Sequence, residues 1–117
     1  MAFDETLAKR VAKVFSDKEI VFITKKMMGG LCFMVDDKMC VGVDKDRLMV
    51  RLDPEDYLAA LSQQGCHPMD FTGRPLKGFV FVDRTGIETD AKLEYWIEQA
   101  IAFNPRAKSS KRTKRSP

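Results

Sequence analysis

The side chains best suited to chemistry in this 117-residue chain are three cysteines and a single histidine. Cys66 and His67 are neighbours, while Cys32 and Cys40 lie far upstream, without the CxxC spacing of a zinc site. Adjacent Cys and His residues do not make a catalytic dyad, because the fold normally brings such partners together from distant positions. We therefore expect free, buried thiols, no metal and no cofactor.

Serine, carboxylate and glycine patterns have structural explanations. No serine stands in a GxSxG turn. The acid clusters at 36–37 and 44–46 fall where hairpin turns are expected, and Asp53 is placed to cap a helix. The pair Gly29-Gly30 follows two lysines but lacks the GxxxxGK[ST] and GxGxxG patterns of phosphate loops, so a turn or bulge is expected there. This inventory predicts a protein that is not an enzyme.

Charge divides the chain into two unlike parts. The net charge of +3 is the sum of −3 over residues 1–105 and +6 over residues 106–117. We predict a mildly acidic domain over 1–105 and a flexible basic tail over 106–117. The tail is either a solvated end or a non-specific nucleic-acid contact that works by counterion release. Its basic residues are Arg106, Lys108, Lys111, Arg112, Lys114 and Arg115.

The N-terminus predicts a cytoplasmic location. It is acidic early and has no apolar segment of the signal-peptide type. The longest near-apolar stretch, at 27–35, is interrupted by two glycines and is too short to span a bilayer. Three free cysteines agree with a reducing compartment.

The elements that must position these residues begin with a helix. Asp4 is a suitable N-cap, and apolar residues including Leu7, Val11 and Phe15 repeat at helical spacing after it. The β-branched and aromatic run at 20–24 predicts a strand that ends near the two lysines following it.

Three further strands are predicted at 31–35, 39–43 and 47–52, separated by acidic turns at 36–38 and 44–46. Turn signals at short, even spacing indicate an antiparallel meander. In the fourth strand, apolar residues alternate with arginines and one methionine, which predicts one buried face and one wetter face. The alternating residues are Arg47, Leu48, Met49, Val50, Arg51 and Leu52.

Asp53-Pro54 predicts the start of a second helix that stops at Gly65. A loop then leads to a strand at 76–82, and a last helix starts at residue 89 or 90 and ends at Asn104-Pro105. The order is α-β-β-β-β-α-β-α. It predicts an α+β two-layer sandwich, in which an antiparallel sheet of about five strands carries helices on one face.

The loop at 70–78 is dense in special residues, and two interpretations stay open. Asp70 and Thr72 can bond the local backbone while Arg74 makes an internal ion pair. Alternatively, Arg74 and Lys77 form a contact for an anion or a partner.

Two segments carry a family resemblance. Residues 25–43 read KKMMGGLCFMVDDKMCVGV, and residues 68–83 read PMDFTGRPLKGFVFVD. Both resemble signature segments of the TfoX/Sxy N-terminal domain family, and the similarity runs collinearly from about residue 3 to Phe103. Met28 stands where that family usually has Phe, and Phe79 where Trp is common. Both are apolar exchanges.

The resemblance implies a compact α/β domain similar to the YgaC and secretion-chaperone-like fold group. It also implies a bacterial, non-enzymatic protein that acts in transcription regulation through contacts with another protein or with itself, since named members are competence co-activators. Those regulators carry a second, C-terminal domain, whereas this chain continues into a basic tail. The resemblance carries over no catalytic residue. Its motif loops are the expected contact sites: Lys25, Lys26, Met28, Gly29, Gly30, Asp70, Phe71, Thr72, Gly73, Arg74, Lys77 and Gly78.

Two other functions are weighed against this expectation. The first is a nucleic-acid accessory protein that uses the tail, with Lys25, Lys26, Arg74 and Lys77 as further contacts. The second is a small-molecule or enzyme site, which requires a deep pocket where the loops at 28–30 and 74–77 converge.

Overall fold

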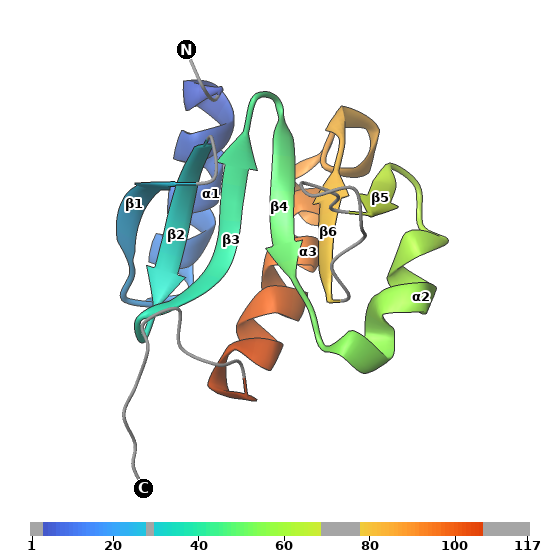
Figure 1. The fold of residues 1–117 in the computed structure, drawn as a ribbon. Coiled ribbons are helices and arrows are strands. Elements are labelled where there is room, and N and C mark those ends of the chain that lie inside the picture. The colour runs from blue at the N-terminus through green and yellow to red at the C-terminus, as the bar shows by residue number, and fades with distance from the viewer. Residues whose placement is uncertain (1–3, 28–29, 69–77, 107–117) are drawn as a thin grey trace, which may run out of the picture.

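The computed structural model describes residues 4–27, 30–68 and 78–106. Its described strands form one antiparallel sheet in the order β1-β2-β3-β4-β6-β5, and α1 and α3 cover one face of it (Figure 1). The chain is therefore α+β with two layers, as predicted. The elements are α1 (Glu5–Asp17), β1 (Ile23–Met27), β2 (Gly30–Val35), β3 (Lys38–Asp44), β4 (Arg47–Arg51), α2 (Tyr57–Leu61), β5 (Cys66–Pro68), β6 (Phe79–Val82) and α3 (Asp90–Phe103), with 3-10 turns at Pro54–Asp56, Arg84–Gly86 and Asn104–Arg106.

Local capping chemistry sets the helix starts as predicted. The Asp4 carboxylate accepts hydrogen bonds from the backbone N–H groups of Thr6 and Leu7, at 2.8 and 3.2 Å. Thr89 caps α3 in the same way through the N–H of Lys92. α3 gives way to a 3-10 turn at Asn104, where the helix was expected to end.

The meander from β1 to β4 is confirmed, and the tight turn between β2 and β3 explains the acid cluster at 36–37. Asp36 and Asp37 both have positive φ, 55° and 63°, between β2 and β3. Lys45 has a φ of 56° between β3 and β4. Two-residue hairpins require such left-handed conformations, which Asp tolerates better than branched residues.

β1 begins three residues later than predicted. The strand expected at 20–24 is present but shifted to 23–27, because residues 20–22 complete the helix end and the core. The N–H of Ile20 donates to the carbonyl of Phe15, and Phe22 packs its ring against Phe15 and Phe33. The ladder with β2 then runs from Ile23 onward, so both lysines lie inside the strand.

The region after α2 also differs from the prediction. α2 ends at Leu61, and Gly65 follows in the left-handed region with a φ of 80°. The segment predicted as loop contains β5, which pairs with β6 from Cys66 to Pro68. The described sheet therefore has six strands where about five were expected. β6 begins at Phe79, and residues 76–77 of the expected strand lie outside the described residues.

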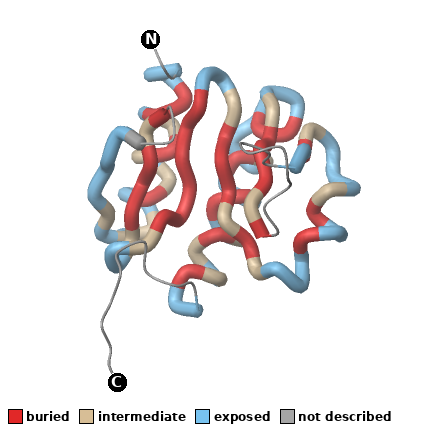
Figure 2. Tube along the Cα trace, in the orientation of Figure 1, coloured by how far each residue is buried: buried red, intermediate tan, exposed pale blue. Residues whose placement is uncertain are grey.

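Apolar side chains fill both faces of the sheet centre, shown as buried strands in Figure 2. The larger cluster lies between the sheet and the helices and includes Phe15, Phe33, Val41, Leu48 and Ile97. The second cluster consists of Cys32, Met34, Met39, Met49 and Phe81, with Phe79 packed against it.

The prediction of a wetter second face along β4 is therefore wrong. Met49 is fully buried, and the guanidinium of Arg47 lies 3.6 Å from the centre of the Phe81 ring. Arg51 lies over Phe79 at 5.3 Å. Arginine stems and methionine pack against apolar surface as readily as branched residues do, so alternation with Arg and Met does not indicate a wet face.

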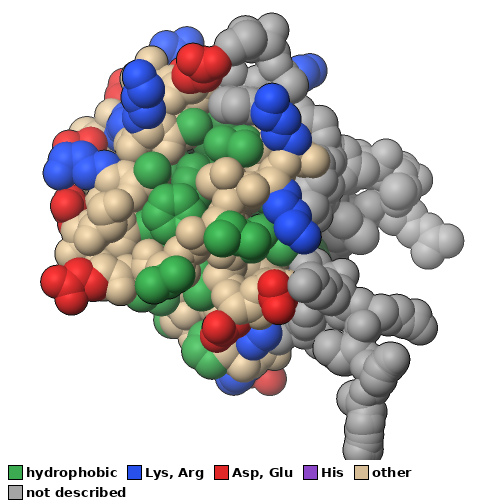
Figure 3. All heavy atoms as spheres, turned by 90° about the vertical axis from the view of Figure 1, so that its left-hand side faces the viewer, with side chains coloured by type: hydrophobic (Ala, Val, Ile, Leu, Met, Phe, Trp, Pro, Cys, Tyr) green, Lys and Arg blue, Asp and Glu red, His purple; other side chains and the backbone are tan. Residues whose placement is uncertain are grey.

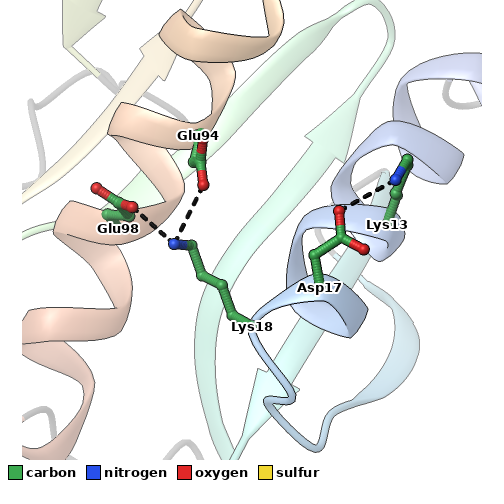
Figure 4. Close-up of polar contacts among 5 residues, drawn as sticks. All are labelled: Lys13, Asp17, Lys18, Glu94 and Glu98. Atoms are coloured by element: carbon green, nitrogen blue, oxygen red, sulfur yellow. Dashed lines mark hydrogen bonds and ion pairs between the residues drawn. The ribbon is translucent and has the colours of Figure 1, made fainter.

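Lys18 joins the two long helices (Figure 4). It follows the last residue of α1, and its Nζ lies 2.6 Å from a Glu98 carboxylate oxygen and 3.2 Å from one of Glu94, both on α3. The hydrogen bonds to Glu98 and Glu94 raise the pKa of Lys18. A separate pair, Lys13 with Asp17 at 3.1 Å, lies within α1.

Candidate functional site

The first motif segment lies at one edge of the sheet. Lys25 and Lys26 are exposed on β1, the outermost strand, and Gly30 begins β2 opposite Met27. Gly30 is buried, and a Cβ built on it would overlap the carbonyl oxygen of Val43. The glycine is therefore needed for close packing of the backbone, while the lysines are free to contact a partner.

The described residues of the second motif segment, 68 and 78–83, lie towards the other end of the strand order, at β5 and β6. Gly78 is buried with a φ of 91°, and its carbonyl accepts a hydrogen bond of 2.6 Å from the N–H of Leu52. Strands β2, β3 and β4 separate β6 from β1, so the structure does not bring Gly78 together with Lys25 and Lys26. The remaining expected contacts lie outside the described residues: Met28, Gly29, Asp70, Phe71, Thr72, Gly73, Arg74 and Lys77.

A cavity of about 380 Å³ lies beside Gly78. Arg51 and Arg106 line it, each with its guanidinium over a phenylalanine ring that lines the same cavity, Phe79 and Phe103 respectively. Sequence reasoning missed this cavity, because its lining residues come from three separate segments. The other lining residues are Leu52 and Pro54.

Arg106 belongs to the folded part of the chain. Its guanidinium lies 2.6 Å from a carboxylate oxygen of Asp53, which also caps the 3-10 turn at Pro54–Asp56. The hydrogen bond from the Glu55 N–H and then the bond from Arg106 lower the pKa of Asp53. The domain boundary after residue 105 stays a prediction. The other basic tail residues, from 108 onward, lie outside the described residues.

Comparison with protein families identifies the chain. The sequence model of the TfoX N-terminal domain matches residues 21–104. The chain belongs to the TfoX N-terminal domain family. The match begins just before β1 and reaches the end of α3, so it includes both motif segments. Searches of curated proteins and of solved structures gave no match.

The cysteines of this TfoX N-terminal domain are buried thiols outside any disulfide, as predicted. Burial raises the pKa of the Cys32 and Cys66 thiols to about 11 and that of Cys40 to about 12. A thiol must ionise to act as a nucleophile or bind a metal, so all three are held in the unreactive form at neutral pH. Within the described ranges, no three His, Cys, Asp or Glu side chains gather to hold a metal ion, and no helix is long and apolar enough to cross a membrane.

His67 contacts a carboxylate and not the neighbouring cysteine. Its Nε2 lies 2.8 Å from Asp83 Oδ2 at an exposed position. The Thr85 hydroxyl also donates to Asp83, at 2.6 Å, and the bonds from Thr85 and His67 lower the Asp83 pKa. A catalytic hydroxyl would have to hydrogen-bond the imidazole that takes its proton. The Thr85 hydroxyl instead hydrogen-bonds the Asp83 carboxylate. The group is a surface hydrogen-bond network that ties β5 to the end of β6.

We predict that the folded thiols resist modification and that alkaline pH destabilises the domain. As the pH rises above the ordinary thiol pKa of 9.0, the unfolded chain releases protons that the fold retains up to about 11 or 12. The free energy of unfolding should therefore fall over this range. Urea unfolding at neutral pH and at about pH 10 measures this decrease in the free energy of unfolding. The decrease should be smaller in Cys40→Ala, because that variant lacks one of the three thiols. Rapid labelling of the native thiols by a disulfide reagent at neutral pH would contradict the prediction.

Proposed function

We propose that this TfoX N-terminal domain is a cytoplasmic, non-enzymatic regulatory module that acts by binding protein. The observation that carries the proposal is the family match over residues 21–104. Named family members are transcriptional co-activators of competence, which act on other macromolecules and not on small substrates. We place this chain in transcription regulation by the same route.

The chemistry of the described residues supports this proposal. The three thiols are held protonated by burial, and His67 is engaged by Asp83. In contrast, the β1 edge presents two exposed lysines and exposed apolar side chains, which are features of a contact surface.

A photo-crosslinking experiment tests the proposal. A crosslinking residue is placed at exposed positions on β1, α2 and α3 in turn, and the full chain is expressed in cells that lack its own gene. We expect reproducible crosslinks to a defined protein, competed by untagged chain, and altered transcript levels in the deletion strain that the wild-type chain restores. No crosslink above background at any position, together with unchanged transcripts, would overturn it.

A second function, non-specific nucleic-acid binding through the tail, is favoured by the separation of charge. Five basic residues follow Arg106 without any acid, next to a domain of opposite net charge. Each phosphate contact releases counterions, so five contacts would give a slope of log affinity against log salt of about −4.5.

Truncation after Arg106 is the matched test of this second function, because it removes the tail and keeps the ion pair with Asp53. Duplex DNA is titrated into full-length and truncated protein at two salt concentrations. If the tail binds DNA, truncation should abolish the affinity. Binding that survives truncation would place the site on the domain, and no binding of the full chain at low salt would end the idea.

A further inference from the structure

The cavity beside Gly78 has the size and the lining of a small-molecule site. Its volume of about 380 Å³ falls within the range of about 300–1,000 Å³ in which such sites occur. None of the described residues that line it is acidic, and two of them, Arg51 and Arg106, carry positive charge. The apolar residues that line it are Leu52, Pro54, Phe79 and Phe103. This lining favours a ligand that is apolar over most of its surface and negatively charged at one end.

Regular elements hold the walls of this cavity in place. Arg51 is the last residue of β4 and pairs with Phe79, the first residue of β6. The N–H of Leu52 bonds the Gly78 carbonyl beside that pair, and Phe103 is the last residue of α3. These side chains are therefore positioned before a ligand arrives, which lowers the entropy lost on binding.

The two arginines differ in their partners. Arg106 is neutralised by Asp53, whose carboxylate oxygen lies 2.6 Å from its guanidinium. In contrast, the Arg51 guanidinium makes no hydrogen bond or ion pair with any residue in the described part of the chain. Its contact with the Phe79 ring leaves the N–H donors free.

Arg51 is also partly buried. Burial lowers its pKa, because the charged form loses hydration. A guanidinium that is partly removed from water without an acidic partner is costly, and a bound anion would offset that cost. Arg51 is therefore the group in this cavity that an anion would complement.

We propose that this cavity binds a small organic carboxylate with an apolar body. The carboxylate accepts two hydrogen bonds from the Arg51 guanidinium, whose planar fork matches its two oxygens. The apolar body lies against the rings of Phe79 and Phe103. A carboxylate suits this lining better than a phosphate, because one unpaired guanidinium balances one negative charge and apolar walls would leave a second one unsolvated. The inference goes beyond the proposed function and does not depend on it, because purified protein alone tests it.

Titration of the purified full chain tests the role of the negative charge. Phenylacetate, 3-phenylpropionate and hexanoate are each compared with the matching uncharged amide, and backbone amide signals in NMR spectra report both affinity and location. We expect saturable binding of at least one acid with a Kd on the order of 1 mM, and shifts centred on Leu52, Gly78 and Phe79. The matching amide should bind at least about tenfold more weakly, because it lacks the charge-assisted hydrogen bonds.

Arg51→Met separates the proposed contact from a general effect on the fold. Methionine keeps an unbranched apolar side chain over Phe79 and removes the charge. The variant should weaken binding of the acid about tenfold and leave binding of the amide unchanged, which a loss of structure could not do. Arg84→Met is the matched control, because Arg84 also lacks an ion-pair partner among the described residues but lines a different cavity. It should leave both affinities unchanged.

Phe103→Ala tests the apolar part of the site. It should weaken the acid and the amide by the same factor, because it removes apolar contact and no charge. A loss confined to the acid would contradict the position given to the apolar body.

The NMR shifts also distinguish this cavity from the exposed apolar surface near β1. Val21 and Ile23 are 86% and 54% exposed there, and Figure 3 shows hydrophobic side chains gathered on this side of the molecule. Shifts confined to these two residues would overturn the inference. Equal affinities for every acid and its amide, an unchanged affinity in Arg51→Met, or no saturable binding of any acid up to about 20 mM would also overturn it. So would inorganic phosphate that shifts the same signals at equal affinity, because the apolar body would then contribute nothing.

Discussion

Replacing Phe15 with alanine is expected to lower the free energy of unfolding by about 3–5 kcal/mol. The Phe15 ring is fully buried, with its centre 5.2 Å from that of Phe22 and 5.8 Å from that of Phe33. It therefore joins the last turn of α1 to the entry of β1 and to β2. Removing it leaves a cavity that the sheet and helix cannot easily close. Urea unfolding followed by circular dichroism measures the change.

Phe103→Ala is the control for this prediction. Phe103 is only half-buried at the end of α3, where it lines the cavity beside Gly78. Its removal should cost about 1 kcal/mol, because the residue is already partly exposed to solvent. A Phe15 variant no less stable than the Phe103 variant would show that α1 does not pack on the sheet as described.

Replacing Gly30 with alanine is expected to cost about 3 kcal/mol, at the upper end of the range for overpacked positions. The added methyl would overlap the carbonyl oxygen of Val43 and lie 3.1 Å from the Cα of Asp44. These are backbone atoms of β3, so relief requires β2 and β3 to move apart. The midpoint of chemical unfolding measures the loss.

Gly42→Ala provides the matched comparison on the same pair of strands. The nearest atom to its added methyl is the terminal methyl of Met49, at 2.6 Å, which can rotate away. We expect a cost of about 1 kcal/mol, clearly below that at Gly30. Equal costs at the two sites would mean that the flexibility of the neighbouring group does not control the outcome.

Features encoded by neighbouring residues could be predicted from the sequence. Asp4 and Thr89 predict helix starts, because a capping side chain accepts a hydrogen bond from a backbone N–H no more than three residues away. Asp36-Asp37 predicts a hairpin, because the conformation of the turn depends on these two residues. β5 could not be predicted, because its three residues are a strand only through their pairing with β6. The position of β1 depends similarly on Phe22, whose packing against Phe33 no local pattern shows.

The candidate contact site was likewise only partly predictable from the sequence. The exposure of Lys25 and Lys26 could be expected from their charge. The β-branched residues Val21 and Ile23 predict a strand, but this pattern does not show that both side chains are exposed. Only the strand order shows that β1 has no outer neighbour and that these side chains face solvent.

The pairing of β4 with β6 has a consequence for biosynthesis. Residues 52–78 separate these two strands along the chain, and α3, which packs on β3 and β4, comes later still. The meander therefore leaves the ribosome with Leu48 and Val50 uncovered on the face that the helices will bury. Closing the long intervening segment is a non-local step, which slows folding. The nascent chain must therefore avoid aggregation until its last helix has been synthesised.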